Sequence, residues 1–227
     1  MYTLYIANKN YSSWSLRPWV LMRELSIPFD EVVVPFDNCA NSEKFKTFSP
    51  TGKVPCLHDG PLVVWDSLAI TEYLAEHHKG VWPEDPMARA WARSASAEMH
   101  SGFESLREQR SMHCGFRIRT SHTSPALQRD LDRLDALWCE GLARFEGPFL
   151  AGSKFTAVDA FFAPVAFRVQ TYDLPLSEPS LAYAKKLLTL ESMRSWAGAA
   201  LKESWREAAH EETALKAGIL LADIREP

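Results

Sequence analysis

Two patterns of apolar and polar positions divide the chain. In the first eighty residues, short apolar runs rich in β-branched residues alternate with segments whose apolar positions recur at helical spacing. The strand-like runs are 3–7 (TLYIA), 29–36 (FDEVVVPF), 53–57 (KVPCL) and 62–65 (LVVW), and the helix-like segments are 15–26, 42–48 and 66–78. A helix between the first two strands predicts a right-handed crossover and a parallel pair. The turn sequence HDGP predicts that the last two strands form a hairpin.

The pattern changes after GVWPEDP, whose two prolines and two acidic residues are typical of a linker. From Met87 onward the chain shows long amphipathic helical patterns and no convincing strand. Helices are predicted at 88–109, 124–145 and 156–172, with one or two more at 181–201. The sequence therefore predicts an α/β plus all-α protein, with an α/β domain at 1–80, a linker at 81–88 and an all-α domain at 89–227.

Composition and charge narrow the possible partners. The chain has 227 residues, 25 basic and 29 acidic, and its net charge of -4 comes without a basic run, so a nucleic-acid partner is not expected. No apolar stretch approaches the ~20 residues of a membrane helix, and MYTLYIANKN lacks the features of a signal peptide, so we expect no membrane partner. The four cysteines, at 39, 56, 114 and 139, have no metal-ligand spacing; they indicate reduced thiols, no metal and a cytoplasmic location.

Two short motifs each allow a structural and a functional interpretation. Val54-Pro55 is either an ordinary trans proline opening an edge strand or a cis peptide whose Val54 backbone groups face a peptide-like ligand. Asp66 and Ser67, at a predicted helix N-terminus, are either plain capping residues or ligands for an α-amino group and an α-carboxylate. Asp159 stands at capping-box spacing from Thr156 and is assigned to structure.

Three serines are crowded into NYSSWSLRPW, just after the first predicted strand. Because a proline is tolerated in the first helical turn, Pro18 places the helix start near Ser13 to Ser15. One serine is then needed to cap the N-terminus of this helix. A hydroxyl between the first strand and the helix can also donate to an anion such as a thiolate. Whether Ser12 or Ser13 contacts a substrate stays open on this reasoning alone.

Taken together, these pieces resemble the cytosolic glutathione transferase family. The order β-α-β-α-β-β-α followed by an all-α domain is that family's plan, and its first domain is thioredoxin-like. KVPCL, DSLAITEYL and FTAVDAF stand where the family has its cis-proline, its glutamate-serine motif and its capping box. The resemblance covers essentially the whole chain, and it favours the ligand-binding interpretations of Pro55 and of Asp66 with Ser67.

SSWSLR is most similar to the motif of the serine-type zeta and tau classes, which in the zeta class reads Ser-Ser-Cys-Ser-x-Arg. The match places the catalytic serine at Ser12, with Ser13 as the alternative after a slip of one residue. Trp14 stands where the omega and beta classes have a cysteine, which disfavours disulfide exchange. The zeta class includes maleylacetoacetate isomerase, but its arginine for dicarboxylate substrates aligns with Thr171 here, and Arg168 lies one turn earlier.

The resemblance implies glutathione as co-substrate. Val54 beside Pro55 would hold the cysteinyl part, Asp66 with Ser67 the γ-glutamyl part, and Lys53 the glycine carboxylate. The electrophile is expected against Tyr11, Trp14, Met112, His113 and Phe116.

The enzyme would position and activate the glutathione thiolate for attack on a small electrophile whose identity the sequence does not name, as in detoxification. A glutathione-dependent isomerase and a non-catalytic glutathione-binding module are the alternatives. The family also implies a homodimer.

Overall fold

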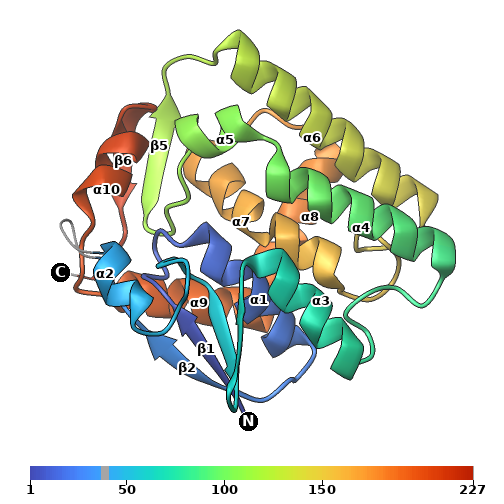
Figure 1. Ribbon diagram of the computed structural model, residues 1–227. Coiled ribbons are helices and arrows are strands. Elements are labelled where there is room, and N and C mark those ends of the chain that lie inside the picture. The colour runs from blue at the N-terminus through green and yellow to red at the C-terminus, as the bar shows by residue number, and fades with distance from the viewer. Residues whose placement is uncertain (37–40, 227) are drawn as a thin grey trace.

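The computed structural model describes residues 1–36 and 41–226 (Figure 1). Its first part is a four-stranded sheet of order β2-β1-β3-β4, with three helices around it. β2 runs parallel to β1, whereas β3 and β4 are antiparallel to their neighbours. The bounds are β1 (Tyr2–Ile6), α1 (Ser13–Glu24), β2 (Phe29–Val33), α2 (Asn41–Lys46), β3 (Cys56–Asp59), β4 (Leu62–Trp65) and α3 (Ser67–His77). The predicted element order, parallel pair and hairpin are confirmed.

The two faces of this sheet carry different apolar clusters, because side chains alternate along each strand. Leu4 and Leu57 join the main core with the residues of α1 and α3. Cys56, one position along β3, faces the other side and packs with Phe45 and Phe48 from α2 and the turn after it. Cys39 lies outside the described residues.

The second part is mainly helical. Its bounds are α4 (Pro86–Ser101), α5 (Glu104–Gln109), β5 (Phe116–Thr120), α6 (Pro125–Arg144), α7 (Ala157–Tyr172), α8 (Glu178–Thr189), α9 (Glu191–Lys202), α10 (Ala208–Leu215) and β6 (Gly218–Asp223). The expected thioredoxin-like plus helical fold class is confirmed. α4 begins at Pro86, so the last residues of the expected linker are already helical.

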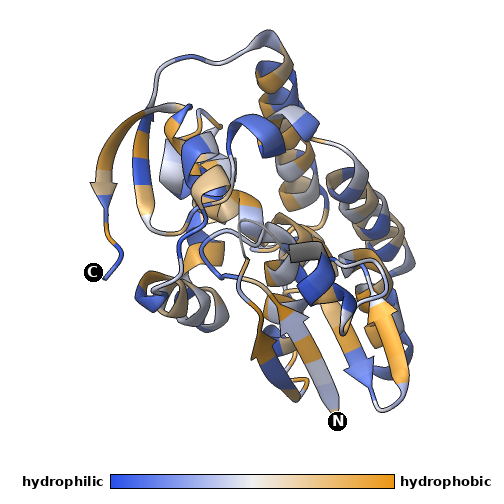
Figure 2. Ribbon diagram, turned by 60° about the vertical axis from the view of Figure 1, so that its left-hand side comes forward, coloured by the Kyte–Doolittle hydropathy of each residue, from blue (hydrophilic) through white to orange (hydrophobic). Residues whose placement is uncertain are grey.

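Two short strands in this part were not predicted. β5 and β6 pair antiparallel although about a hundred residues separate them. FRIRT does alternate, with Phe116 and Ile118 buried between arginines that point outward, but five residues inside a helical region carry little periodic signal. In Figure 1 this ribbon and α10 lie at the left of the molecule, on the side of α5 and away from α4. Figure 2 shows β6 to be largely apolar, and Ile219 and Leu221 are exposed on it.

The helix predicted at 88–109 is broken in the structure. α4 ends at Ser101, and α5 begins after Phe103, whose φ of 53° is left-handed. A Cβ on Gly102 would lie 2.8 Å from the carbonyl oxygen of Glu98, so only glycine fits this close approach. After the break, α5 packs against α6 and α10, and its Arg107 lines the site described below.

One apolar core joins the two parts. α1 packs against α7 and α9 as well as against α3, and residues of all four helices belong to a single buried cluster. At the start of α7, Asp159 is fully buried and accepts hydrogen bonds from Thr156 N at 2.9 Å and Leu150 N at 3.0 Å. The capping box is present as predicted. Within residues 1–36 and 41–226, no helix combines the length and the apolar character needed to cross a membrane.

Candidate functional site

Two cavities meet where the first part of the chain faces the second. One has a volume of about 460 Å³ and the other about 410 Å³. Trp14, Lys53 and Val54 line both. The first is otherwise lined by Thr51, Pro55, Trp65, Asp66 and Ser67. The second is otherwise lined by Tyr11, Ser12, Ser13, Phe36, Phe45, Gly52, Arg107, Ser111, Met112, Arg168 and His210.

All five residues expected to bind glutathione line the first cavity. Lys53 is exposed, whereas Val54 is half-buried just before β3 and outside its ladder. The Val54-Pro55 peptide is cis, as the resemblance favoured. A single wall of this cavity therefore presents a backbone segment beside a cation.

The N-terminus of α3 forms the opposite wall. Asp66 is its N-cap, and one carboxylate oxygen accepts from Leu68 N at 2.8 Å. Its other oxygen lies 3.5 Å from Nε2 of His100. The hydroxyl of Ser67 is buried and has no hydrogen-bond partner within the described part of the chain. A free hydroxyl at a helix N-terminus suits a carboxylate, so the residues present fit the γ-glutamyl end of glutathione.

The serines of the β1–α1 loop line the second cavity. Ser12 is the N-cap residue of α1 and is 4% exposed, and its Oγ donates to Oγ of Ser15 at 2.7 Å. Ser15, fully buried, also accepts from Ala7 N at 3.3 Å. Ser13 is half-buried at the first position of the helix. Ser15 thus has the structural role that its position predicted, while Ser12 and Ser13 both face the cavity.

A buried carboxylate from the second part of the chain holds this loop. Glu203, just after α9, accepts from Lys9 N at 2.7 Å and from Asn10 N at 3.2 Å. Asn10 donates in turn to the carbonyl of Ala200 at 2.8 Å, and it accepts from Gly115 N at 3.2 Å. Burial raises the pKa of Glu203, against the lowering effect of its two backbone bonds. The contacts join residues nearly two hundred positions apart, so sequence reasoning missed them.

Three of the five electrophile-site candidates line the second cavity, namely Tyr11, Trp14 and Met112. The other two do not. His113 is fully buried and stacks on Phe116 with ring centroids 3.6 Å apart. Its Nδ1 accepts from Gly115 N and Phe116 N, and burial lowers its pKa to about 3. His113, in the turn before β5, and Phe116, at the start of β5, therefore pack against each other and away from the cavity.

The second cavity is bounded by cationic side chains. Arg107 and Arg168 line it, and Arg17 lies behind it with its guanidinium 4.0 Å from the ring centroid of Trp14. Nε of Arg168 donates to the carbonyl of Arg110 at 2.7 Å. None of these three arginines forms an ion pair with a carboxylate of the described residues. Thr171 is buried and donates to the carbonyl of His113, so Arg168 is the residue of α7 that reaches the cavity.

Burial is the main electrostatic effect on these arginines. The pKa of Arg168 is lowered to about 10, mainly by burial; Tyr172 opposes this effect, and the neighbouring Arg107 adds to it. Burial lowers the pKa of Arg17 as well, with contributions from Arg168 and Arg107. Cations gathered without a counter-charge favour an anion between them. The cavity is therefore suited to a thiolate or a carboxylate.

The described cysteines lie away from the two cavities. Cys56 and Cys114 are buried, and burial raises the pKa of the Cys56 thiol to about 11. Where the structure describes the chain, no group of three or more His, Cys, Asp or Glu side chains is placed to hold a metal ion. Neither Cys56 nor Cys114 lines the cavities.

Two family models match the chain. Residues 11–77 match the model described as the glutathione S-transferase N-terminal domain, and residues 120–208 match that of the C-terminal domain. Together they span well over half of the sequence.

Individual proteins of known name are also similar to this chain. A probable maleylacetoacetate isomerase of Caenorhabditis elegans is 27% identical over 77% of this chain and 81% of its own. A glutathione S-transferase of Arabidopsis thaliana is 31% identical over 66% of this chain and 63% of its own. The maleylacetoacetate isomerase of Rattus norvegicus is 25% identical over 84% of this chain and 89% of its own.

Solved structures share the fold. A glutathione transferase homologue from Burkholderia, crystallised with bound glutathione, superimposes with a TM-score of 0.64 at 24% identity over 88% of this chain and 97% of that one. A tau-class glutathione S-transferase from mango gives a TM-score of 0.67 at 18% identity, with 95% and 96% of the two chains covered. At such identities the likeness concerns the fold.

Proposed function

Since the chain belongs to the glutathione S-transferase family and is a glutathione-dependent transferase, we propose that its two joined cavities hold glutathione and a small electrophile. One observation carries this proposal. The cavity with a free hydroxyl at a helix N-terminus opens beside Trp14, Lys53 and Val54 onto a cavity that contains Ser12 and Ser13. A tripeptide bound in the first therefore directs its thiol into the second.

The tripeptide is held by five residues. Ser67 donates to the γ-glutamyl carboxylate, and the positive end of the α3 dipole favours that charge. Asp66 accepts from the α-amino group, and the backbone of Val54, before Pro55, pairs with the cysteinyl part. Lys53 contacts the glycine carboxylate. These contacts supply affinity and position, and none of them touches the sulfur.

Ser12 is our first assignment for the donor to the thiolate, and Ser13 is the alternative. The hydroxyl of Ser12 donates to Ser15, whereas the hydroxyl of Ser13 has no acceptor among the described residues. When a thiolate is present, Ser15 can donate to Ser12 and leave the proton of Ser12 for sulfur. A donor to an anion in a water-poor cavity stabilises it more strongly than water does.

A glutathione-dependent isomerase of the maleylacetoacetate type is the second candidate. The observation that favours it is the pair Arg107 and Arg168, which line the electrophile cavity without a carboxylate partner among the described residues. Two guanidinium groups suit a substrate with one or two carboxylates. Two relatives are named as such isomerases.

Other features of the proposal follow the family. We propose domains at 1–80 and 89–227 with a linker at 81–88, a homodimer in solution and a cytoplasmic location. Detoxification is the proposed role, with neither nucleic acid nor a membrane as partner.

Kinetics with two electrophile classes test the function. The purified protein is assayed with glutathione and either chlorodinitrobenzene or maleylacetone, and products are identified by mass spectrometry. A transferase accumulates a conjugate, whereas an isomerase converts maleylacetone and releases glutathione unchanged. Absence of glutathione-dependent turnover with both, together with no retention on immobilised glutathione, would refute the proposal.

Single-serine variants test the mechanism. Ser12→Ala should keep most of the glutathione affinity, because the tripeptide contacts remain, and it should reduce turnover on the order of a hundredfold. The pKa of bound glutathione, read from thiolate absorbance against pH, should rise. If Ser13→Ala shows these effects and Ser12→Ala does not, the donor is Ser13; if neither does, the serine mechanism is wrong.

A further inference from the structure

His210 lies in the electrophile cavity, and no motif in the sequence pointed to it. It belongs to α10, close to the C-terminal end of the chain, and it lines the same cavity as Ser12 and Ser13. Its imidazole stacks on Phe36 with an interplanar angle of 17° and a centroid distance of 5.3 Å. The ring of Tyr11 is its second aromatic neighbour, with the two ring centroids 5.5 Å apart. Two aromatic neighbours therefore fix the plane of the imidazole.

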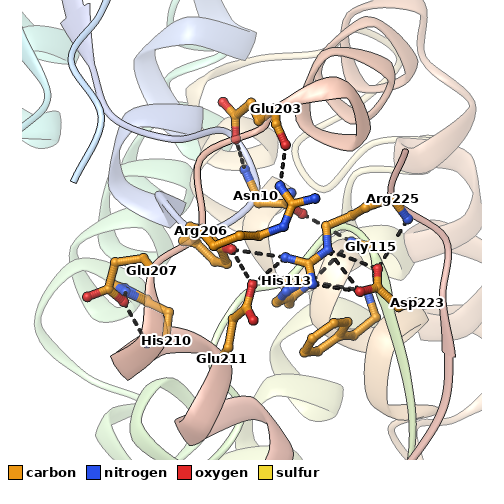
Figure 3. A network of polar contacts seen from close by, with 12 residues as sticks. Asn10, His113, Gly115, Glu203, Arg206, Glu207, His210, Glu211, Asp223 and Arg225 are labelled. Carbon is orange, nitrogen blue, oxygen red and sulfur yellow. Dashed lines mark hydrogen bonds and ion pairs between the residues drawn. The ribbon is translucent and has the colours of Figure 1, made fainter. Parts of the chain in front are cut away.

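A buried carboxylate fixes which ring nitrogen faces the cavity. Oε2 of Glu207 lies 2.6 Å from Nδ1 of His210 and also accepts from His210 N at 2.7 Å (Figure 3). Glu207 is 6% exposed. Because a carboxylate only accepts, Nδ1 carries the proton and the lone pair of Nε2 is left free. Nε2 is neither buried nor hydrogen-bonded to any described residue.

The other ionisable side chains around His210 are already committed. The hydroxyl of Tyr11 donates to Oε1 of Glu211 at 2.6 Å, and Arg225 binds both of them. Arg225 is bound in turn by Asp223. Burial raises the pKa of Tyr11 well above its ordinary value, and the hydrogen bond to Glu211 adds to the rise. His210 is thus the group on this wall with a free proton-accepting atom.

We propose that His210, oriented by Glu207, is the general base of the reaction, an inference that rests on the proposed glutathione transferase function. Nε2 takes the proton of the glutathione thiol, and the S–H electron pair stays on sulfur. The thiolate, held by the serine hydroxyl, then forms the carbon–sulfur bond. The imidazolium returns the same proton to the atom that received the displaced electron pair, a leaving group or a carbanion. Glu207 is a positioning residue, since it acts through His210.

Steady-state kinetics of His210→Ala test the inference. General acid–base catalysis contributes about 10²–10⁴-fold, so kcat should fall about a hundredfold or more. The Kd for glutathione, measured by calorimetry, should stay within about threefold, because the tripeptide contacts lie in the other cavity. Free imidazole added to the assay should restore part of the lost rate, which a structural role would not produce. Glu207→Gln keeps an acceptor for His210 N and should lower kcat with little effect on KM.

His122→Ala is the matched control, since His122 is exposed and outside both cavities; it should keep the parent rate. If His210→Ala does not fold, His210→Gln replaces it in the same assays. A His210 variant with kcat within twofold of the parent, or with a loss that imidazole does not restore, overturns the inference. The variants are compared with a parent protein that shows glutathione-dependent turnover. A parent without such turnover refutes the proposed function instead of this inference.

Discussion

Removal of the Glu203 carboxylate should loosen the loop that carries Ser12 and Ser13. Glu203 comes from the segment after α9 and accepts from Lys9 N and Asn10 N, two buried backbone donors that lie three and two positions before Ser12. The change proposed is Glu203→Ala. It removes both acceptors without touching any residue that lines the cavities.

The magnitude follows from the two stranded donors. A buried N–H left without a partner costs about 1–3 kcal/mol, so two cost about 2–6 kcal/mol. Burial raises the pKa of Glu203, which means that the carboxylate itself is poorly solvated and that its removal returns part of this sum. We expect the free energy of unfolding to fall by about 2–4 kcal/mol, a large share of the roughly 5–15 kcal/mol typical of a domain.

Urea unfolding followed by tryptophan fluorescence measures this change. Trp196 is a suitable reporter, because its indole N–H donates to the carbonyl of Lys9 at 2.9 Å. Protein concentration is held fixed, since assembly would shift the midpoint. Turnover is measured in parallel, and kcat should fall as the position of Ser12 becomes less defined.

Glu212→Ala is the control. Glu212 lies on α10 with 68% of its side chain exposed, and it pairs only with Lys216. This variant should unfold at the parent's midpoint. If Glu203→Ala unfolds no earlier than Glu212→Ala, or if its stability falls while kcat is unchanged, Glu203 does not hold the serine loop in its working position.

Three more outcomes are expected. Ser67→Ala should weaken glutathione binding about tenfold or more, the value of a hydrogen bond to a charged group, while Ser101→Ala on exposed α4 should not; calorimetry decides. Burial raises the pKa of Asp159 to about 6 from 3.8, so its contribution to stability is full below about pH 4 and is lost as pH rises through 6. The parent's free energy of unfolding should fall by up to ~3 kcal/mol across this pH range, whereas that of Asp159→Asn, measured by urea unfolding, should not. Sedimentation should give a dimer, and a single 25.7 kDa species at micromolar concentration would contradict it.

The sequence could predict which residues gather at the first cavity, because that part of the site is local. Val54 with Pro55, and Asp66 with Ser67, each lie within two adjacent residues whose chemistry depends on one turn of backbone. The periodicity also sufficed for the element order of the first eighty residues, since each strand and helix there is marked by its own pattern. The α/β plus all-α division followed from the same periodicity, whereas the cis peptide and the thioredoxin-like class of the first part followed from a family resemblance.

Long-range contacts decided the rest. No local pattern relates residues as far apart as Glu203 and the loop at Lys9 and Asn10, or as Ser12 and His210, which line the same cavity. His113 and Phe116 were expected at the electrophile site from their residue types, yet packing of the turn before β5 buries both. A short break at Gly102 turned one predicted helix into two.

What the sequence by itself determined is the set of local conformations and the residues whose role is settled within a turn of chain. Tertiary structure decided which of the remaining polar side chains meet. A side chain such as Arg168 or Glu207 is chemically competent in any fold, and burial and the neighbours brought by packing decide whether it faces a cavity. Those neighbours come from distant segments, and their positions are fixed only when the common core of the two parts has formed.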